Sequence, residues 1–297
     1  MLKYRRLIGA DAGVRATLRP MPRCGAMSKQ FDHSALVGFT RDSFRSSSGE
    51  SHELYRIGTG PAVIVIHEVP GITPLVAAFA RKVAAAGMTA VLPNLFGTPE
   101  RIPTTGYEIS SALKACVSRE FTVFATNKTS PIAGYLRELA THEHEACGGP
   151  GVGAVGMCLT GGFALAMSVN ESVVAPVMSQ PGLPAPLGAK RKAATGVSES
   201  DFQVIKRRSE AGLCVMGLRF SGDPGSPEER FATLRRELGE NFLGVEIDSS
   251  PGNPWGYRKG AHSVLTEDYS DAEGSPTRQA LEDVLAFLST RLGVTTT

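Results

Sequence analysis

The chain has 297 residues, 42% hydrophobic and 20% charged, which is the composition of an ordinary globular protein and excludes a disordered chain. Its net charge of +2 is unevenly spread. Residues 1–26 hold six basic residues and one acidic residue, so the other 271 residues carry a net charge of −3. A mildly acidic body excludes binding to nucleic acid or to an anionic membrane by bulk electrostatics, and we expect neither partner.

Residues 1–49 are predicted to form a basic, flexible N-terminal extension. The N-terminus lacks the apolar core of a secretory signal, so it is a basic tail, a transit-like leader or sequence upstream of a true start at Met27. The chain has five cysteines, an odd and widely spaced set that does not suggest a disulfide framework. This pattern predicts a reduced, cytoplasmic setting. Residues 146–170 carry no charge, but seven glycines between 148 and 162 make them a poor membrane-spanning helix.

Short apolar runs alternate with helical patterns over residues 50–293. Most of the runs are continuously apolar, as expected for strands that are covered on both faces. The six predicted strands are Ala62–His67, Met88–Leu92, Val152–Gly156, Val173–Met178, Leu213–Phe220 and Phe242–Ile247. This alternation predicts a single α/β domain over residues 50–293, with a mostly parallel sheet and helices on both of its faces.

Four predicted helices begin with a hydroxyl residue followed by proline, a favourable N-cap and first-turn pair. These pairs are Thr73-Pro74, Ser130-Pro131, Ser226-Pro227 and Ser275-Pro276. Ser226 and Glu229 also have the spacing of a capping box. Glycines at the far ends of the first and last of these helices, Gly87 and Gly293, are predicted to close them.

Residues 180–211 interrupt the alternation of strands and helices. They begin with a proline-rich run and contain two basic triplets, Lys190–Lys192 and Lys206–Arg208. One interpretation is a lid or a substrate-binding excursion above the sheet. The other is a solvated surface connection, and the basic triplets favour this reading over a nucleic-acid patch.

The glycine-rich stretch 151–162 contains two rival motifs. Gly151, Gly153 and Gly156 match the spacing of the dinucleotide-binding fingerprint, which would suggest a nucleotide-dependent oxidoreductase. That fingerprint follows a strand and opens a helix. Here the matched glycines lie inside the predicted strand, and the residues before them do not form one.

The second motif is a nucleophile elbow, in which a strand ends at Gly156, turns at Cys158 and enters a helix at Gly161. A helix N-terminus favours the thiolate and supplies N–H groups for an oxyanion. Thr160 stands where the usual pattern has glycine. The alternative is a buried structural cysteine, the commonest role of a free thiol.

An elbow requires an acid and then a histidine further along the chain. His262 is the one histidine after Cys158, and it follows the last predicted strand. Asp223 and Asp248 each follow a strand and compete for the acid's role. Asp223 is preferred because the acid normally comes from the strand before the histidine's, although an Asx turn would also explain it.

Over residues 50–292 the chain resembles the dienelactone hydrolase family of α/β-hydrolases. The resemblance rests on three segments in order: Val63–Gly71 followed by Leu92–Phe96, then Gly156–Gly162, and then Asp223 with Gly260–Ser263. It implies an α/β-hydrolase fold and a carboxylic-ester hydrolase with no cofactor. The implied substrate is a small ester or lactone, cleaved through a covalent acyl-enzyme.

The resemblance also implies a role for each matched residue. Cys158 would be the nucleophile, His262 the base and Asp223 the acid that orients the base. Glu68 would contact the resting cysteine and control when the thiolate forms. The backbone N–H groups of Leu159 and Val69 would form the oxyanion hole.

The sequence departs from the family at the positions that grip an anionic substrate. The arginines expected near Thr98 and Thr266 are absent, and Arg101 is the nearest substitute for the first. We therefore expect a pocket that is less selective for anionic substrates. A non-catalytic binding or regulatory member of the fold remains the main alternative.

Two short segments that contain histidine could suggest a metal site, but neither has the required spacing. His67-Glu68 is not followed by a second histidine at the distance that such motifs need. His142 and His144 are two residues apart, so on a helix their side chains do not face each other. We expect no metal.

Overall fold

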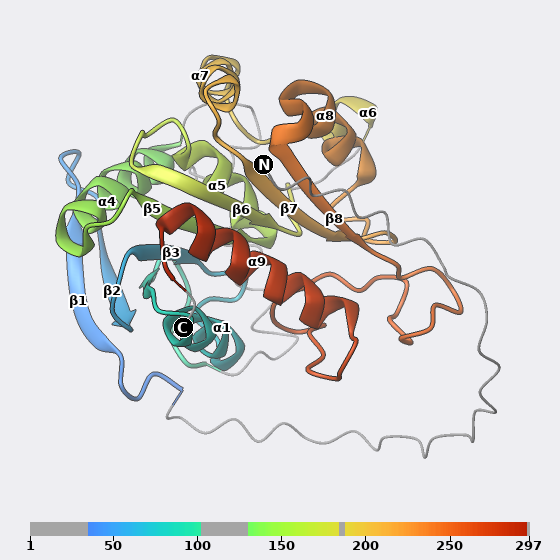
Figure 1. The fold of residues 1–297 in the computed structure, drawn as a ribbon, viewed down its shortest axis with the longest axis horizontal. Helices are drawn as coiled ribbons and strands as arrows, with labels where there is room; N and C mark the ends of the chain where they lie inside the picture. The colour runs from blue at the N-terminus through green and yellow to red at the C-terminus, as the bar shows by residue number, and fades with distance from the viewer. Residues whose placement is uncertain (1–34, 102–129, 184–187, 296–297) are drawn as a thin grey trace. The chain divides into compact units, whose positions relative to one another are not determined.

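The computed structural model describes residues 35–101, 130–183 and 188–295. The strands in these residues form one eight-stranded sheet in the order β1-β2-β4-β3-β5-β6-β7-β8 (Figure 1). β2 pairs antiparallel with β1 and β4, and all other pairs are parallel. The strands are β1 (Thr40–Arg45), β2 (Ser51–Ile57), β3 (Ala62–Ile66), β4 (Thr89–Pro93), β5 (Val152–Met157), β6 (Val173–Ser179), β7 (Val215–Phe220) and β8 (Phe242–Ile247).

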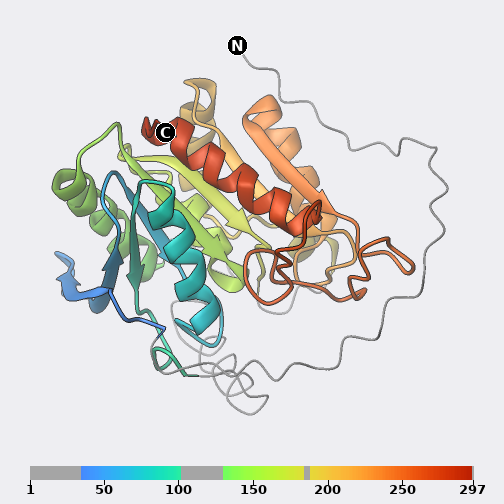
Figure 2. The same cartoon turned by 60° about the horizontal axis from the view of Figure 1, so that its bottom comes forward.

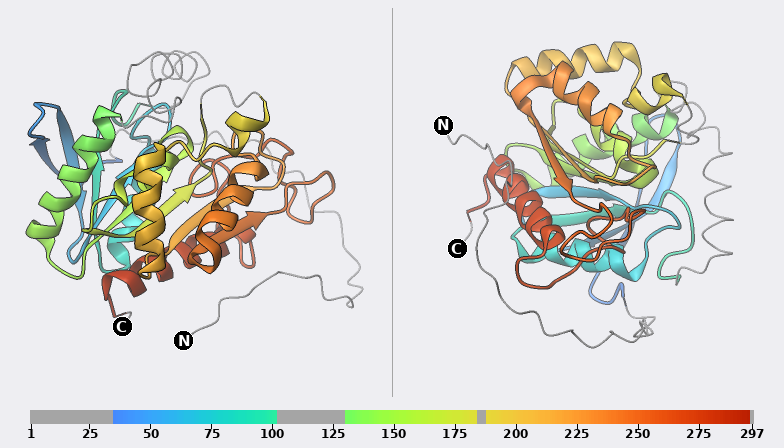
Figure 3. Two further views of the ribbon diagram at one scale, coloured as in Figure 1. Left: turned by 90° about the horizontal axis from the view of Figure 1, so that it is seen from above. Right: turned by 90° about the vertical axis from the view of Figure 1, so that its right-hand side faces the viewer.

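Helices cover both faces of the sheet, as predicted (Figure 3). One face carries α1 (Pro74–Ala85) and α9 (Pro276–Leu292), which lie across the strands in Figure 2. The other face carries α4 (Pro131–Cys147), α5 (Gly161–Met167), α7 (Glu199–Glu210) and α8 (Glu228–Leu238). The short α6 (Ala189–Ala193) contacts α8.

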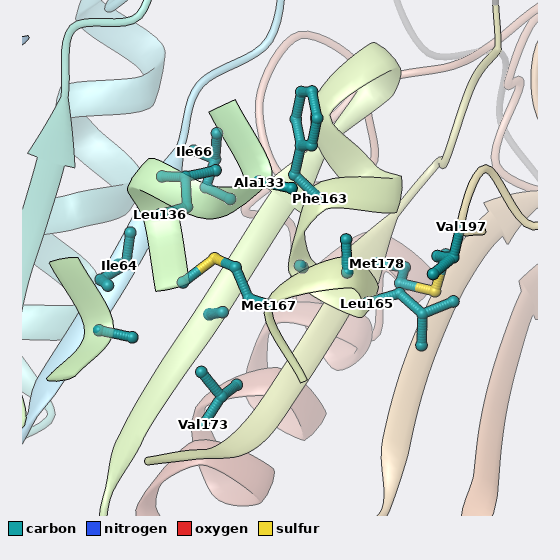
Figure 4. Packing of buried hydrophobic residues seen from close by; sticks show 14 of the residues in the cluster. Ile64, Ile66, Ala133, Leu136, Phe163, Leu165, Met167, Val173, Met178 and Val197 are labelled. Carbon is teal, nitrogen blue, oxygen red and sulfur yellow. The ribbon is translucent and has the colours of Figure 1, made fainter. Parts of the chain in front are cut away.

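β3 shows why the strands are apolar throughout. Val63 and Val65 point into the cluster beneath α1 and α9, while Ile64 and Ile66 point into the cluster beneath α4 and α5. All four side chains are fully buried. Figure 4 shows the second cluster, where Phe163 and Met167 of α5 lie against the sheet. Burial on both faces removes the alternation of polar and apolar residues that marks a half-exposed strand.

The centre of the sheet is a topological switch point. β4 lies on one side of β3 and β5 lies on the other, so the strand order changes direction at β3. In open α/β sheets such a point leaves a crevice at the carboxyl ends of the strands. Ile66, the last residue of β3, pairs with Gly156 of β5, so the segments that follow these strands meet there.

All six strands predicted from the sequence are present, with ends shifted by two residues or fewer. The predicted capping box at Ser226 is wrong, because α8 begins at Glu228 with Pro227 as its extended N-cap. The carboxylate of Glu229 instead accepts a hydrogen bond from its own backbone N–H. Thr73 does cap α1, accepting a hydrogen bond from the Val76 N–H at 3.3 Å.

The ordered domain begins before the predicted boundary at residue 50, because β1 lies inside the segment assigned to a flexible extension. β1 is almost entirely exposed and polar, so it has no apolar pattern that a sequence reading could detect. Residues 1–34 lie outside the described part of the chain. The charge-free stretch 146–170 resolves into the end of α4, β5, a turn and α5. Among the described residues, no helix combines the length and apolar character needed to cross a membrane.

Arg56 of β2 joins the antiparallel edge of the sheet to α4. Its guanidinium binds both carboxylate oxygens of Glu143, with Nε 3.2 Å from Oε2, and also reaches Asp42 of β1 at 2.7 Å. The side chain of Glu143 is fully buried. Because a buried carboxylate needs a partner, this pair holds the β1–β2 hairpin against the rest of the domain.

Replacing Arg56 with Met should lower the free energy of unfolding by about 3 kcal/mol, because the buried Glu143 loses its guanidinium partner. Urea denaturation of the purified protein measures this change. Arg41→Met is the matched control, since Arg41 pairs with Glu53 on the exposed surface and should contribute less than about 1 kcal/mol. The double substitution Arg56→Met with Glu143→Met should recover much of the loss. Equal effects of Arg56→Met and Arg41→Met would contradict the interpretation.

Candidate active site

Cys158 occupies a strained turn between β5 and α5. Its φ of +55° lies in the left-handed region, which residues other than glycine rarely adopt. Cys158 is also the first residue of a turn of 3₁₀ helix, η1 (Cys158–Thr160). A Cβ atom on Gly156 would lie 2.3 Å from the Thr160 carbonyl oxygen, and one on Gly161 would lie 2.7 Å from Pro181 Cα. The glycines of the motif are therefore sterically required, as a nucleophile elbow demands.

Thr160, the departure from the usual glycine, has a structural task of its own. Its buried hydroxyl accepts a hydrogen bond from the Met157 N–H at 3.0 Å. The hydroxyl oxygen also lies 2.9 Å from the carbonyl oxygen of Ile66 and 3.2 Å from that of His67, to which it can donate. The side chain thus connects the end of β5 to the end of β3 beneath Cys158.

His262 lies beside Asp223, with 2.6 Å between Nδ1 and Oδ2. The other oxygen of Asp223 accepts a hydrogen bond from the Gly225 N–H at 2.8 Å. Asp223 therefore also forms the Asx turn that was the alternative explanation for it. Asp248, the competing acid, is exposed and its carboxylate accepts from the Ser250 N–H instead. Asp268 supports the histidine loop by accepting the His262 N–H at 2.7 Å.

The side chain of Cys158 also acts on the ring of His262. Burial disfavours the charged ring, but the hydrogen bond to Asp223 and the interaction with Cys158 outweigh it and raise the pKa of His262 to about 11. The ring is therefore an imidazolium at neutral pH. Cys158 and Leu159 are partly exposed, whereas β5 before them is completely buried, so the thiol lies where the core meets the surface.

Glu68 follows β3 and is buried, with 8% of its surface exposed. One carboxylate oxygen accepts from the hydroxyl of Thr266, and the other accepts from Ser263 at 2.8 Å and from Gln180 at 3.2 Å. Burial raises the pKa of Glu68, while these donors and the charge of His262 act against the rise. Its hydrogen bonds within the described residues lead to the histidine loop and to β6, and none of them goes to Cys158.

The residues at the positions expected to recognise an anionic substrate differ in their burial. Thr266 is buried and bonded to Glu68, so a hydroxyl occupies the place where an arginine was expected. Thr98 and Arg101 are exposed on the segment after β4. Val69, Phe96 and Leu159 are partly buried apolar residues at the ends of β3, β4 and β5.

Two buried residues beside the elbow were missed by sequence reasoning. Gln180 follows β6 and contacts Glu68. Arg230, only 1% exposed, donates to the carbonyl oxygens of Pro181 and Ala194 and so ties the start of the 180–211 excursion to a residue in its middle. The excursion also contacts the elbow, since the Gly182 N–H donates to the Cys158 carbonyl oxygen at 2.8 Å. The position of Arg230 on the buried face of an amphipathic helix was the available signal.

The glycines that suggested a dinucleotide fingerprint serve close packing instead. A Cβ atom on Gly151 would lie 2.5 Å from the Ser172 carbonyl oxygen, and one on Gly153 would lie 2.8 Å from the Leu288 side chain. Gly153 and Gly156 lie within β5 rather than in a loop after a strand, so the structural context of the fingerprint is missing.

His67 is a buried structural histidine. Burial lowers the pKa of His67 to about 4, so its ring is neutral. Nε2 accepts the Leu95 N–H at 3.2 Å, which leaves Nδ1 to donate to the Glu68 carbonyl oxygen at 3.1 Å. No cluster of three or more histidine, cysteine, aspartate or glutamate side chains suited to a metal occurs in the described ranges.

A family model for the dienelactone hydrolase family matches residues 55–291, nearly the whole folded domain. The chain belongs to the dienelactone hydrolase family. Solved structures with low sequence identity to this chain share its fold. No match was found among curated protein sequences.

Two similar solved structures carry related descriptions. A putative dienelactone hydrolase from Klebsiella pneumoniae has a TM-score of 0.55 and 16% identity, covering 84% of this chain and 99% of its own. A dienelactone hydrolase-like promiscuous phosphotriesterase from metagenomic libraries has a TM-score of 0.53 at the same identity and the same coverage. The mostly parallel sheet with helices on both faces is thus the α/β-hydrolase fold.

The raised pKa of His262 predicts how stability depends on pH. Because the folded-state value of about 11 exceeds the ordinary value of 6.5, the folded protein holds this proton more tightly than the unfolded chain. The resulting stabilisation is complete below pH 6.5 and is lost as the pH rises toward 11. The difference in unfolding free energy between wild type and His262→Gln should therefore shrink across this interval. Urea denaturation at several pH values measures it, and a difference that grows with pH would contradict the assignment.

Thr160→Val should keep the shape of the side chain but remove the hydroxyl between β3 and β5. Leaving the Met157 N–H without its buried acceptor should destabilise the protein by about 1–3 kcal/mol. Thr160→Ser, which retains the hydroxyl, should lose clearly less. Thermal unfolding of the three proteins provides the comparison, and Ser and Val variants of equal stability would show that the hydroxyl has no bridging role.

Proposed function

We propose that this protein is a thiol hydrolase that cleaves a small ester or lactone through a covalent acyl-enzyme. The observation that carries the proposal is the hydrogen bond of 2.6 Å between His262 and Asp223, together with the effect of Cys158 on the same ring. The nucleophile sits on a strained turn at the edge of the buried core. Membership of the dienelactone hydrolase family supports hydrolysis as the reaction class.

The charged state of the site favours attack by sulfur. An imidazolium next to the sulfur favours the thiolate, which is the nucleophilic form of cysteine. Asp223 holds the ring by Nδ1 and stabilises its charge. The thiolate adds to the carbonyl carbon of the substrate, and the carbonyl π electrons move onto oxygen to form a tetrahedral oxyanion.

The oxyanion would be stabilised by the backbone N–H groups of Leu159 and Val69. These residues follow β5 and β3, whose parallel pairing places them at one edge of the sheet. One oxyanion-hole donor contributes about 3–4 kcal/mol in comparable enzymes. The cis peptide bond between Val69 and Pro70 belongs to the same segment.

The remaining steps return the protons and the sulfur to their starting state. Collapse of the oxyanion breaks the carbon–oxygen bond of the ester, and the leaving alkoxide takes the proton of His262. The neutral ring then removes a proton from water, whose oxygen attacks the thioester carbon. Loss of the Cys158 thiolate releases the carboxylic acid.

Neutral esters and lactones are the substrates we propose. Thr266 places an uncharged hydroxyl where family members that bind an acid carry arginine, and this hydroxyl is bonded to Glu68 rather than presented to solvent. Partly buried apolar residues such as Val69, Phe96 and Leu159 surround the strand ends and suit an apolar acyl group. Arg101 remains the candidate contact for a polar or charged substituent.

Cys158→Ala should lower kcat/KM for an activated aryl ester by at least about a thousandfold, since the covalent route is lost. Cys214→Ala is the matched control, because Cys214 is also a partly exposed free thiol and should be dispensable. Mass spectrometry of wild type with a slow substrate should detect an acyl adduct on Cys158. Full activity in Cys158→Ala would overturn the proposal, as would an adduct on a different residue.

A further inference from the structure

Gln180 has an unusual backbone for its position. It follows the last residue of β6 with a φ of +36°, in the left-handed region, although it is neither glycine nor asparagine. It also precedes Pro181, and a residue before proline normally adopts extended backbone. The residue is completely buried. Strained residues of this kind cluster at functional sites, where surrounding contacts enforce them.

Neighbouring groups determine the orientation of the Gln180 amide. The backbone N–H of Val264 can only donate, and it lies 3.3 Å from Oε1. Ser179 donates to the same oxygen. The amide nitrogen therefore faces Glu68, with 3.2 Å between Nε2 and Oε2. An amide N–H₂ group can only donate, so this oxygen of Glu68 must be an acceptor.

These contacts close a loop of hydrogen bonds around Glu68. Ser263 and Thr266, on the loop that carries His262, donate to the same carboxylate. Gln180 thus contacts Glu68 with one end of its amide and the histidine loop with the other. A single side chain connects the carboxyl ends of β3 and β6 to the segment that positions the base.

We propose that Gln180 is a positioning residue that keeps Glu68 ionised and fixes it against the loop of His262. The inference rests on the proposed function, in which His262 works as an imidazolium beside Cys158. A donor facing a buried carboxylate stabilises its charge. The negative charge of Glu68 in turn favours the proton on His262. Gln180 would therefore act on the protonation of the site without touching the substrate.

Titratable groups from several elements surround this hydrogen-bond network. Glu68 and the neutral His67 follow β3, and Cys158 follows β5. Asp223 follows β7, hydrogen-bonds His262 and interacts electrostatically with the buried cation of Arg230 on α8. Asp268, on the histidine loop itself, binds the backbone of His262 and Ser263 and the exposed Arg258.

The test compares Gln180→Met with wild type, using the full-length protein and two pH profiles. The first is the rate of alkylation at Cys158 by iodoacetamide, read from the modified peptide. The second is kcat/KM for an aryl ester. Without its donor Glu68 takes up a proton, and the loss of a negative charge makes the His262 imidazolium beside the thiol easier to deprotonate. Both profiles should shift to lower pH by about one unit, and kcat should fall about tenfold with little change in KM.

Two further variants separate this role from a general structural one. Gln203→Met is the matched control, because Gln203 donates to Glu199 at 2.8 Å on the exposed surface of α7 and should leave both profiles unchanged. In a Glu68→Gln background the charge is already absent, so Gln180→Met should cause no additional shift. If Gln180→Met does not fold, Gln180→Asn tolerates the left-handed backbone and, being too short to span both contacts, should shift the profiles in the same direction.

The outcomes distinguish this inference from the proposed function. Superimposable profiles for Gln180→Met and wild type would overturn the role of Gln180, as would a shift that persists in the Glu68→Gln background. Ester hydrolysis that does not depend on Cys158 would overturn the proposed function instead. The alkylation profile needs no substrate, so it tests Gln180 in either case.

Discussion

The parallel pairing of β3 with β5 is the constraint on which the site depends. It brings Glu68 and Val69 to the same edge of the sheet as Cys158 and Leu159, although the two segments are separated by an entire crossover. The hydroxyl of Thr160 connects the last residues of the two strands directly. Because this connection lies beneath the turn at Cys158, the strain of the turn is stored against buried backbone rather than against a mobile loop.

The second organising feature is a balance of charges around one ring. The pKa of His262 is raised by its interactions with Asp223 and Cys158, and the nearby carboxyl of Glu68 has its own pKa raised by burial. Each acid is held by several donors, so neither can move to follow the ring. Such preorganised charges stabilise a transition state without the reorganisation that water would require. The uncharged Thr266 completes the donor set of Glu68 without bringing a competing cation into it.

Much of this arrangement could be read from the sequence, for reasons that also explain the failures. Apolar runs located the strands, and Cys158, Asp223 and His262 each follow a strand, so their meeting at one edge was predictable. Gln180 was not, because its role depends on a backbone conformation and on partners 84 and 112 residues away. Arg230 was missed for a similar reason, since its acceptors are carbonyl oxygens, which every residue type supplies. The exposed β1 left no apolar pattern, and Ser226 was displaced as a cap because Pro227 took the extended conformation.

The hydrogen bonds around Glu68 also bear on how the molecule is assembled. Ser263 and Thr266 lie 195 and 198 residues beyond the carboxylate that they bind, so these two donors are synthesised long after Glu68. Contacts of such high sequence separation form late and slow the folding of parallel sheets. During synthesis Glu68 therefore lacks these two donors until the loop that carries His262 has been made, although Gln180 is available earlier. A chain truncated before residue 262 would contain Cys158 but neither His262 nor two of the three side-chain donors to Glu68, so the proposed site is complete only once this loop has joined the rest of the domain.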